Sequence, residues 1–528
     1  MKKNKPYPLY QLHEISDLKE LIDYQAQIHP QAPAFQWKTR KEKFARTRKE
    51  FQNDIRRLVN SFAERNIENE TIAIIGENSY MYLVVFFAIV ISGNIAVPID
   101  KDASKEDIVN MLRLARAGQV IYSSGYDEFV SSLPQPIQAV SIDQLSETYP
   151  KAANDHYDPI EIDPDAICAY FFTSGTEGFP KAVMLSHRNV AFDINKACRN
   201  FVLEGDTVSF LPFHHCFGLI TAIFKVFNYG KTTFIDSSLR RIQKTLKEEK
   251  PQTIFVVPLF LETFHKRIWT TIRKEGAEAR IRRSMQRAEQ LLKLDIDFRR
   301  KIFNKIIDEL GGNLQYVICG GAFLDQDIID DFHAWGITVL NGYGITECSP
   351  VVAVNRNHFI KKGSVGQVLE DVEIRISPDG EICVKGDLVM QGYFNDPQAT
   401  AQVLQDGWFN TRDLGTIDSD RFLFLTGRGK NLIILSNGEN VSPEQIEMVL
   451  SRHDEIAEVV VFEKNSQLCA AIYPDPDLDR PQEKIEEIVA RYNEQQPAAK
   501  QIARTMLRSE PFEKNASQKI VRSKATGE

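Results

Sequence analysis

Residues 166–181 read AICAYFFTSGTEGFPK, an apolar run followed at once by a loop of glycines, hydroxyl side chains and a lysine. The apolar run, residues 166–172, has the length and composition of a buried strand. In α/β proteins, the loops that follow such strands often carry the ligand site. The segment therefore predicts a strand that brings a polar loop to the edge of a sheet.

Short apolar runs recur on both sides of this segment. Thr71–Ile75, Ile95–Ile99 and residues 232–235 alternate with longer helix-like stretches, and residues 253–257 and Tyr316–Cys319 continue the pattern. Strands that alternate with helices are typical of a sheet with helices packed on it. We expect an α/β fold with a large N-terminal domain of packed α/β subdomains.

The composition and the pattern of predicted elements change in the later part of the chain. Residues 262–311 are rich in Arg, Lys, Glu and Leu at helical spacing, which predicts a helical insertion with a solvated basic face. Short segments around a Pro-Asp-Gly turn predict a small β-barrel-like subdomain over residues 363–427. Beyond it, a helix capped by Ser442 and two paired strands predict a smaller α+β domain. The expected domains are residues 1–427 and residues 428–528.

Size and charge limit the class of protein. At 528 residues and 60.2 kDa the chain is long enough for two or more domains. A hydrophobic fraction of 43% is that of a soluble globular protein. The formal charge of -8 argues against a main role in neutralising nucleic-acid phosphates, so we expect no nucleic-acid partner.

The cysteines and the N-terminus indicate the compartment. Seven cysteines without CxxC spacing predict neither a disulfide framework nor a zinc site. The N-terminus lacks the apolar stretch of a signal peptide. Residues 81–92 are the most apolar run and fall short of the ~20 residues of a membrane-spanning helix. We expect a cytoplasmic protein with no transmembrane segment, and a buried helix at residues 81–92.

The polar loop at residues 173–181, TSGTEGFPK, suits a phosphate group. Its glycines let backbone amides approach an anion, while hydroxyl groups donate hydrogen bonds and a lysine adds positive charge. It is not a Walker loop, because Pro180 and Ala182 stand where that motif needs glycine and a hydroxyl residue. The alternative is a plain turn between strands. The expected phosphate contacts are Thr173, Ser174, Gly175, Thr176, Gly178 and Lys181.

This loop resembles the phosphate-binding signature of the adenylate-forming enzymes, which include acyl-CoA synthetases, luciferases and the adenylation domains of peptide synthetases. Later motifs follow in that family's order over nearly the whole chain. Glu177 departs from the hydroxyl residue usual in the loop, and Ala182 replaces the usual glycine. The resemblance implies a large AMP-binding domain and a smaller, mobile C-terminal domain.

Two apolar motifs resemble parts of that family's acyl and adenine pockets. In LPFHHCFGL, residues 211–219, His215 resembles the histidine beside the acyl pocket; alternatively it is a core histidine near Phe217. The GGA turn, Gly320, Gly321 and Ala322, resembles the turn against the adenine and the acyl chain. In isolation it is only a turn.

The motif NGYGITE, residues 341–347, resembles the segment that holds the nucleotide and its metal. The resemblance makes Tyr343 the ring on adenine, Thr346 the hydroxyl on the α-phosphate and Glu347 the Mg²⁺ ligand. Mg²⁺ typically takes one or two protein carboxylates together with phosphate oxygens. The alternative for Glu347 is a solvated loop acid. The nucleotide contacts implied by this motif are Asn341, Gly342, Tyr343, Gly344 and Thr346.

GWFNTRDLG, residues 407–415, contains Asp413, which resembles the family's ribose-binding aspartate, and Arg428 resembles its partner. A carboxylate suits ribose because the hydroxyls can donate charge-assisted hydrogen bonds to it. The alternative is a surface ion pair, which typically contributes at most ~1 kcal/mol. Lys430 resembles the hinge residue of the C-terminal domain.

KNASQKIVR, residues 514–522, resembles the terminal segment with the catalytic lysine, which corresponds to Lys519. An ammonium placed there would stabilise the negative charge that builds up as a carboxylate attacks the α-phosphorus. A lysine near a C-terminus is otherwise usually solvated. By the same resemblance, Ser436, Asn437 and Gly438 line the pantetheine path of CoA.

The resemblance implies an acid–thiol ligase with ATP, Mg²⁺ and CoA as cofactors. The first step forms acyl-AMP and pyrophosphate, and the second transfers the acyl group to a thiol. The insertion, residues 435–447 and the QKIVR ending look most like ligases for long-chain fatty acids, and we expect a medium-chain or long-chain fatty acid as substrate. Alternatives are an aromatic acid as substrate, an acyl carrier protein as acceptor, a stand-alone amino-acid adenylation enzyme, or a nucleotide-binding protein without turnover. The implied catalytic residues are His215, Thr346, Glu347 and Lys519.

Overall fold

The computed structural model describes most of the chain. The described residues are 5–39, 42–133, 137–148, 160–173, 180–238, 241–431, 433–434, 440–464, 467–497, 500–514, 520 and 522–525. They form two compact units: the first contains Met1–Ile374, Val384–Phe409 and Asp418–Leu423, and the second contains Arg375–Cys383, Asn410–Ile417 and Phe424–Glu528.

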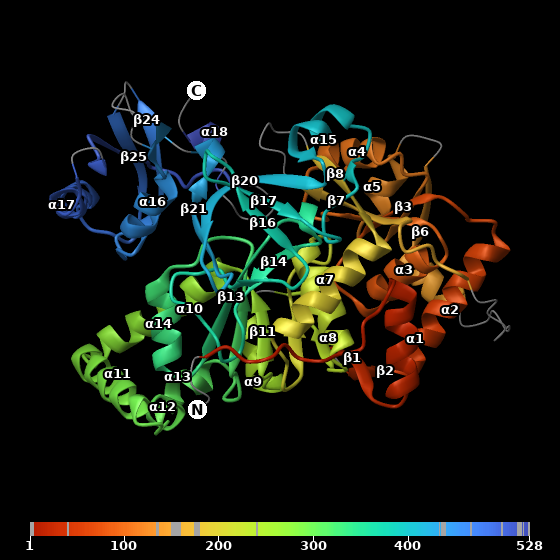
Figure 1. The fold of residues 1–528 in the computed structure, drawn as a ribbon, viewed down its shortest axis with the longest axis horizontal. Coiled ribbons are helices and arrows are strands. Elements are labelled where there is room, and N and C mark those ends of the chain that lie inside the picture. Colours follow the sequence, from red (N-terminus) through yellow and green to blue (C-terminus); the bar gives the residue numbers. More distant parts are fainter. Residues whose placement is uncertain are drawn as a thin grey trace. The chain divides into compact units, whose positions relative to one another are not determined.

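The first unit contains a seven-stranded sheet in the order β18-β8-β7-β4-β3-β5-β6 (Figure 1). The strands β6, β5, β3, β4 and β7 are parallel, whereas β8 pairs antiparallel with both β7 and β18. The strands are β3 Thr71–Ile75, β4 Ile95–Ile99, β5 Gln119–Tyr122, β6 Gln138–Ser141, β7 Ile167–Thr173, β8 Lys181–Ser186 and β18 Gly392–Tyr393.

A nine-stranded sheet of the same unit has the order β15-β14-β13-β12-β11-β9-β10-β1-β2. Its central strands are parallel, and both ends are antiparallel additions. The strands are β1 Pro33–Lys38, β2 Lys43–Thr47, β9 Thr207–Ser209, β10 Thr233–Ile235, β11 Thr253–Val256, β12 Tyr316–Cys319, β13 Thr338–Gly344, β14 Val351–Val354 and β15 Gln367–Val368.

Helices cover both sheets. The helix α7 contacts β8 of one sheet and β14 of the other, so it ties the two sheets together (Figure 1). The helices of this unit are α1 Leu18–Ile28, α2 Arg48–Glu64, α3 Tyr80–Ile91, α4 Lys105–Leu114, α5 Asp127–Ser131, α6 Ile142–Thr148, α7 His187–Asn200, α8 Lys225–Asn228, α9 Ile242–Glu249, α10 Pro258–Lys274, α11 Glu278–Lys293, α12 Arg299–Ile302, α13 Asn304–Glu309, α14 Gln326–Ala334 and α15 Pro397–Val403, with the π-helix η2 Phe217–Phe224 and the 3₁₀ turn η4 Thr346–Cys348.

The apolar run expected to be a buried helix is α3. All of its residues except Met81 are buried, and Ser79 caps it by accepting a hydrogen bond from the Tyr82 amide. A helix that is apolar on all sides is stable only inside a core. The rings of Phe35, Phe51 and Phe227 pack together in the same core, and this packing brings β1 and α2 against α8.

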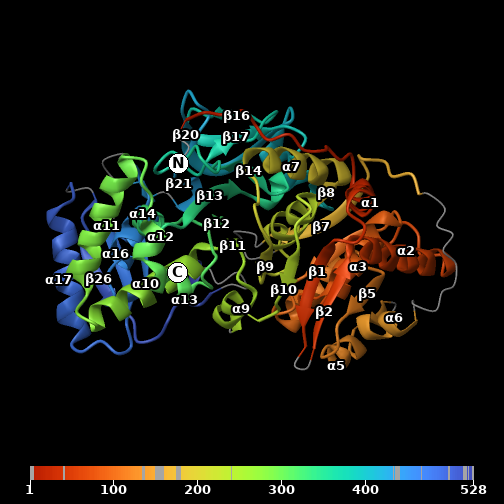
Figure 2. The ribbon, with the colours of Figure 1, turned by 90° about the horizontal axis from the view of Figure 1, so that it is seen from below.

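The expected helical insertion is present as α10 to α13. In Figure 2, α11 and α12 lie at one end of the first unit, and α5 and α6 lie at the other. Of the 16 residues of α11, only Ala288 is buried. The helix therefore rests on its neighbours α10, α12 and α14 with a narrow contact.

A five-stranded sheet has the path β16-β17-β20-β19, with β21 paired to β20. Residues of its strands are divided between the two units. The strands are β16 Glu373–Ile376, β17 Glu381–Lys385, β19 Leu404–Gln405, β20 Trp408–Ile417 and β21 Leu423–Arg428.

The rest of the second unit is an α+β fold around the sheet β24-β25-β26. Successive side chains of β24 point to opposite faces of the sheet, as in any β-strand. Val459 and Val461 pack in one hydrophobic core, and Val460 and Phe462 pack in another. The elements are β22 Ile433–Ile434, β23 Asn440–Val441, α16 Pro443–Ser451, β24 Ile456–Lys464, β25 Gln467–Pro474, α17 Pro481–Glu494, β26 Arg504–Leu507 and α18 Arg522–Ala525.

The expected cap of α16 was wrong in one respect. Ser442 is the N-cap residue, but its side chain caps no backbone amide. The Ser442 hydroxyl instead donates to the Glu444 carboxylate at 2.9 Å. A hydroxyl engaged with a neighbouring carboxylate is not directed at the helix amides, which explains the difference.

Candidate active site

The ends of the predicted phosphate loop lie side by side. Thr173 closes β7 and Lys181 opens β8, and these two residues are paired in an antiparallel register. The loop therefore begins and ends at the same edge of the sheet. The other predicted contacts, Ser174, Gly175, Thr176 and Gly178, lie outside the described residues, as does Glu177.

Tyr393 connects this edge to Glu347. The strand β18 pairs with β8 and places the Tyr393 ring 5.0 Å from Lys181 Nζ, a cation–π distance. The Tyr393 hydroxyl donates to Glu347 Oε1 at 2.8 Å. Sequence reasoning missed Tyr393, since only the pairing of β18 with β8 reveals it.

Glu347 is a buried acid. Its residue is 6% exposed, which does not fit the alternative of a solvated loop acid. Glu347 lies in η4, between β13 and β14, and the loop is closed by a hydrogen bond from the Ile345 amide to the Pro350 carbonyl at 2.8 Å. A buried carboxylate is costly unless a hydrogen bond or a cation compensates it. This arrangement suits a ligand of a divalent cation.

Side chains of helix α7 form hydrogen bonds with backbone groups at and next to the Glu347 loop. Asp193 Oδ1 accepts a hydrogen bond from the Val351 amide at 3.0 Å, where the loop ends. One turn earlier, Asn189 Nδ2 donates to the carbonyls of Asp387 and Val389 at 2.7 and 3.0 Å. The amide of Met390, next in the chain, donates to the Glu347 carbonyl at 2.9 Å. The position of Glu347 is therefore fixed through α7.

His215 lies two residues before the π-helix η2, beside His214. Their ring centroids are 4.2 Å apart, and His214 Nε2 is 3.5 Å from Asp100 Oδ1. Burial lowers the pKa of His214 to about 4 and raises the pKa of Asp100 above its usual value. Gly218 lets this segment fold back, because a Cβ there would lie 2.1 Å from the Pro212 carbonyl oxygen.

The GGA turn lies against two other predicted motifs. A Cβ at Gly320 would be 3.4 Å from the Gly342 carbonyl oxygen and 3.6 Å from the Phe217 ring. Strands β12 and β13 are parallel neighbours, with Cys319 opposite Asn341. Asn341 is buried, and its Oδ1 accepts no hydrogen bond from the described part of the chain. The fold thus brings residues of three motifs together at the carboxyl edge of the sheet.

Tyr343 and Gly344 complete β13. Tyr343 is 7% exposed and lies opposite Ala353 of β14. Gly344 is required by close packing, because a Cβ there would lie 2.3 Å from the Pro350 carbonyl oxygen. The expected contact of Tyr343 with adenine stays a prediction.

In the second unit, Asp413 and Arg428 form the expected pair. Asp413 is 5% exposed on β20, and its Oδ1 is 3.0 Å from Arg428 Nε at the end of β21. The Arg428 side chain is 56% exposed, so solvent weakens the attraction. Asp413 is therefore the buried member of the pair, and its partner stays accessible.

The remaining predicted residues of the second unit are described in part or not at all. The backbone of Lys430 lies in the 3₁₀ turn η5, Gly429–Asn431. Ser436, Asn437, Gly438 and Lys519 lie outside the described residues. Of the described residues of the same motif, Lys514 places its Nζ 2.7 Å from Glu458 Oε1, and Arg522 pairs with Glu447.

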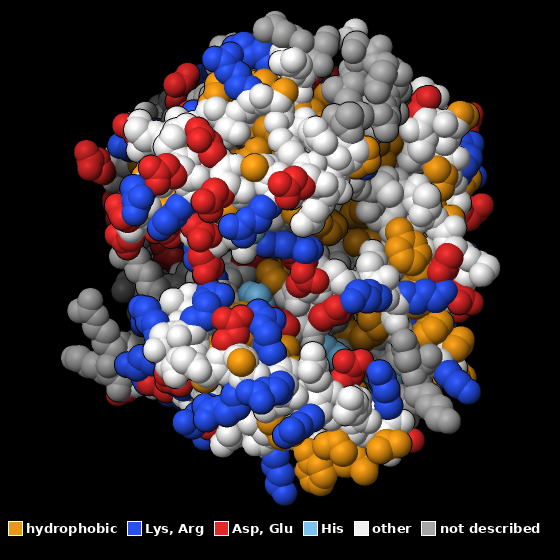
Figure 3. Space-filling model, turned by 90° about the vertical axis from the view of Figure 1, so that its left-hand side faces the viewer, with side chains coloured by type: hydrophobic (Ala, Val, Ile, Leu, Met, Phe, Trp, Pro, Cys, Tyr) orange, Lys and Arg blue, Asp and Glu red, His pale blue; other side chains and the backbone are white. Residues whose placement is uncertain are grey.

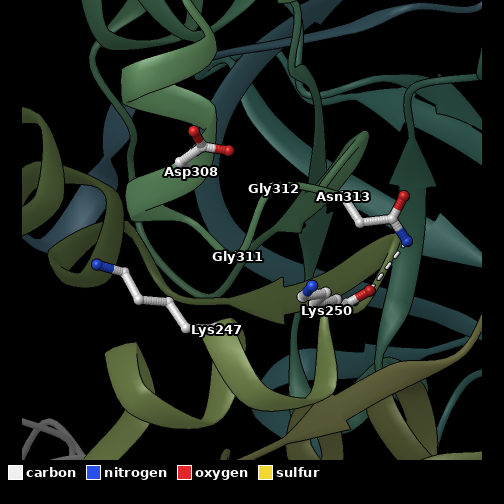
Figure 4. Close-up of a pocket in the computed structure, with 6 residues that line it drawn as sticks. All are labelled: Lys247, Lys250, Asp308, Gly311, Gly312 and Asn313. Carbon is white, nitrogen blue, oxygen red and sulfur yellow. Dashed lines mark hydrogen bonds between the residues drawn. The ribbon is translucent and has the colours of Figure 1, made fainter.

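A surface cavity of about 420 Å³ lies elsewhere in the first unit (Figure 4). Its lining residues include those just before β11 and β12, so the cavity lies at the amino ends of these strands. The GGA turn follows the carboxyl end of β12, and open α/β sheets bind ligands at the carboxyl edge. This cavity contains no predicted site residue. Its lining residues are Lys247, Lys250, Asp308, Gly311, Gly312 and Asn313.

Comparisons with known proteins agree with this geometry. Residues 22–394 match the family described as "AMP-binding enzyme", and residues 430–528 match the "AMP-binding enzyme C-terminal domain". The chain belongs to the AMP-binding enzyme family. The match confirms the expected family, and together with the curated relatives it supports the expected class, an AMP-forming acid–CoA ligase.

Two curated relatives illustrate the similarity. Long-chain-fatty-acid–CoA ligase FadD15 of Mycobacterium bovis is 29% identical over 450 residues, which cover 77% of this chain and 73% of the relative. Long-chain-fatty-acid–CoA ligase 1 of Homo sapiens is 32% identical over 59% of this chain and 48% of its own.

Solved structures share the fold. O-succinylbenzoate CoA synthetase (MenE) from Bacillus subtilis, bound to its acyl-adenylate, has a TM-score of 0.75 and 23% identity over 96% of this chain and 97% of its own. The anthranilate CoA ligase AuaEII, bound to anthranoyl-AMP, has a TM-score of 0.79 and 18% identity over 99% and 98% of the two chains. These likenesses confirm the α/β fold with its large and small domains.

Proposed function

We propose that this enzyme joins a medium-chain or long-chain fatty acid to CoA in two steps. In the first, a carboxylate oxygen attacks the α-phosphorus of ATP, and pyrophosphate leaves with the electron pair of the broken P–O bond. In the second, the thiol sulfur of CoA attacks the acyl carbon, loses its proton and displaces AMP. The relatives whose printed names are long-chain-fatty-acid–CoA ligases support this choice of acid and acceptor.

One arrangement supports the proposal best. In the first unit, the Tyr393 side chain contacts Lys181 with its ring and the buried Glu347 with its hydroxyl group. Glu347 would hold Mg²⁺, which takes its other ligands from phosphate oxygens and offsets the charge of the leaving pyrophosphate. Lys181 adds positive charge at the end of the phosphate loop. Tyr393 orients the Glu347 carboxylate through its hydroxyl group.

The other predicted site residues receive proposed roles. Thr346 contacts the α-phosphate, and His215 lies beside the acyl group. Asp413 accepts hydrogen bonds from the ribose hydroxyls with Arg428 as its partner. Lys519 stabilises the transition state of adenylation, and Lys430 is the hinge between domains at residues 1–427 and 428–528. The proposed contacts of adenine, phosphate and pantetheine are Thr173, Ser174, Gly175, Thr176, Gly178, Gly320, Gly321, Ala322, Asn341, Gly342, Tyr343, Gly344, Ser436, Asn437 and Gly438.

The setting of the reaction is also a proposal. Within the described ranges, no helix has both the length and the hydropathy to cross a bilayer. All seven cysteines are buried and none is disulfide-bonded. A cytoplasmic location stays a prediction.

A product assay tests the proposal. The purified chain is incubated with ATP, Mg²⁺ and CoA and with octanoate, palmitate, benzoate or an amino-acid mixture, and products are measured by mass spectrometry. We expect acyl-CoA and AMP in equal amounts with one or both fatty acids. Turnover with benzoate or amino acids alone would replace the proposed substrate, and AMP release without acyl-CoA would contradict CoA as the acceptor.

A further inference from the structure

The helical insertion is the basic part of an acidic chain. Residues 262–311 contain thirteen lysines and arginines against eight aspartates and glutamates, whereas the whole chain carries a net charge of -8. The helix α11 turns most of its surface to solvent. Its exposed basic side chains include Arg280, Arg283 and Arg287.

Exposed apolar side chains gather where α11 passes into α12. Leu294, Ile296, Phe298 and Ile302, here called the apolar tip, are 71%, 40%, 49% and 41% exposed. Nine large apolar residues are exposed in the described part of the chain, and the tip contributes four of them within nine positions. Single exposed apolar residues are ordinary, but a group of them marks an interaction surface.

The tip is presented by a firmly anchored segment. Between its members, Arg299 is 4% exposed, pairs with Asp297 at 2.8 Å and donates to the His333 carbonyl at 2.6 Å. Arg300 donates to the Leu314 carbonyl at 2.6 Å. Phe303 is buried beside them. The neighbouring residues face inward, so the exposure of Phe298 and Ile302 does not come from loose packing.

Positive charge surrounds the tip. Lys293, Lys301 and Lys305 are exposed next to it; Lys293 Nζ lies 3.3 Å from Glu289 Oε1, and Lys301 Nζ lies 5.8 Å from the Phe298 ring centroid. Of the two acids that alternate with the tip residues along the chain, Asp297 is paired with Arg299 and Asp295 is exposed. Figure 3 shows an orange group at the lower edge of this face with blue side chains above it.

We infer that this surface docks on an anionic lipid bilayer. Apolar side chains inserted at the headgroup level, together with basic side chains on lipid phosphates, are the two contributions that hold a protein on such a surface. The apolar tip supplies the first, and the lysines and α11 arginines supply the second. The inference goes beyond the proposed function, since it concerns binding and needs neither ATP nor turnover.

Vesicle sedimentation tests this inference. The full chain is mixed, without ATP, with sucrose-loaded vesicles of phosphatidylcholine alone or with a third of phosphatidylglycerol. We expect binding to the anionic vesicles and a steep loss of binding with added salt, because screening weakens attraction to a charged surface. Equal binding to both vesicle types, or to neither, would overturn the inference.

Variants locate the surface. The triple change Leu294→Ser, Ile296→Ser and Phe298→Ser alters exposed side chains only and should lower the fraction bound at least about tenfold. The charge reversals Arg283→Glu, Arg287→Glu and Lys301→Glu should do the same. The matched control, Ile28→Ser with Leu114→Ser, changes two exposed apolar residues elsewhere and should bind like the unaltered chain.

Two outcomes with the triple variant would contradict the inference. If the triple variant binds vesicles normally but loses a dimer seen by light scattering, the tip is an interface between copies of the chain. If it binds normally and the mass is unchanged, the tip has no part in docking. Either outcome contradicts the inference, and neither bears on acyl-CoA synthesis, which the product assay measures separately.

Discussion

Lys225 Nζ lies 2.7 Å from Asp193 Oδ2, and both side chains are fully buried. The other carboxylate oxygen of Asp193 accepts the Val351 amide at the end of the Glu347 loop. The pair therefore connects α8, which continues the π-helix η2, to the segment with the proposed metal ligand. No role for either residue was predicted from the sequence, and the two stand 32 positions apart along the chain.

Lys225→Met should destabilise the protein by about 3–5 kcal/mol, because it leaves the buried Asp193 carboxylate without its counter-charge. The measurement is urea unfolding followed by circular dichroism. Asp193→Asn combined with Lys225→Met should recover most of the loss, since no charge is then buried. Equal destabilisation by the single and the double variant would contradict this account of the pair.

His187→Gln should reduce the fall in the free energy of unfolding that occurs as the pH is lowered. Burial lowers the pKa of His187 from 6.5 to about 4, so its contribution to stability is full above pH 6.5 and is lost as the pH falls toward 4. The contribution over this window is about 3 kcal/mol. The measurement is the free energy of unfolding at pH 7 and at pH 4.5, for the unaltered chain and for the variant. If the difference between the two pH values is the same in both proteins, other groups cause the acid sensitivity.

Tyr393→Phe should weaken activation by Mg²⁺ while leaving the fold intact. It removes the hydroxyl that donates to Glu347 Oε1, and hydrogen bonds to charged groups contribute about 1.5–3 kcal/mol. We expect a rise of at least about tenfold in the Mg²⁺ concentration for half-maximal activity. Tyr122→Phe changes a tyrosine hydroxyl on β5 that bonds Asp127 and serves as the control. Equal Mg²⁺ curves for the two variants would remove Tyr393 from the site.

Lys519→Ala should abolish adenylation and largely spare thioester formation from supplied acyl-AMP. In the proposed role, the ammonium stabilises the charge that builds up when the α-phosphorus is attacked, whereas the thiol attacks the acyl carbon and no bond to phosphorus is made or broken in that step. Lys514→Ala, which breaks a pair with Glu458, is the matched control. Equal loss in both half-reactions would refute the role proposed for Lys519.

The strands could be predicted where the apolar run is continuous. Thr71–Ile75, Ile95–Ile99 and Tyr316–Cys319 are strands with the predicted bounds, and the run at residues 166–172 is a strand shifted by one residue. A buried parallel strand needs apolar residues on both faces, and that composition is visible in a single sequence.

The arrangement of the site could be predicted only in part. The motifs indicated which residue types suit phosphate and metal, but not that NGYG would form the end of β13. Tyr393 is 212 positions from its neighbour Lys181, and only a strand pairing brings them together. The π-helix η2 could not be predicted either, since its apolar residues fit any buried helix.

The most direct test of the central claim is ATP–pyrophosphate exchange measured with fatty acid in the absence of CoA. If the enzyme forms acyl-AMP, labelled pyrophosphate should enter ATP only when the acid and Mg²⁺ are present, and Glu347→Gln should lower the rate at least about tenfold, whereas Glu128→Gln should not. Acid-independent exchange, or acyl-CoA formation with release of ADP, would contradict activation through an acyl-adenylate.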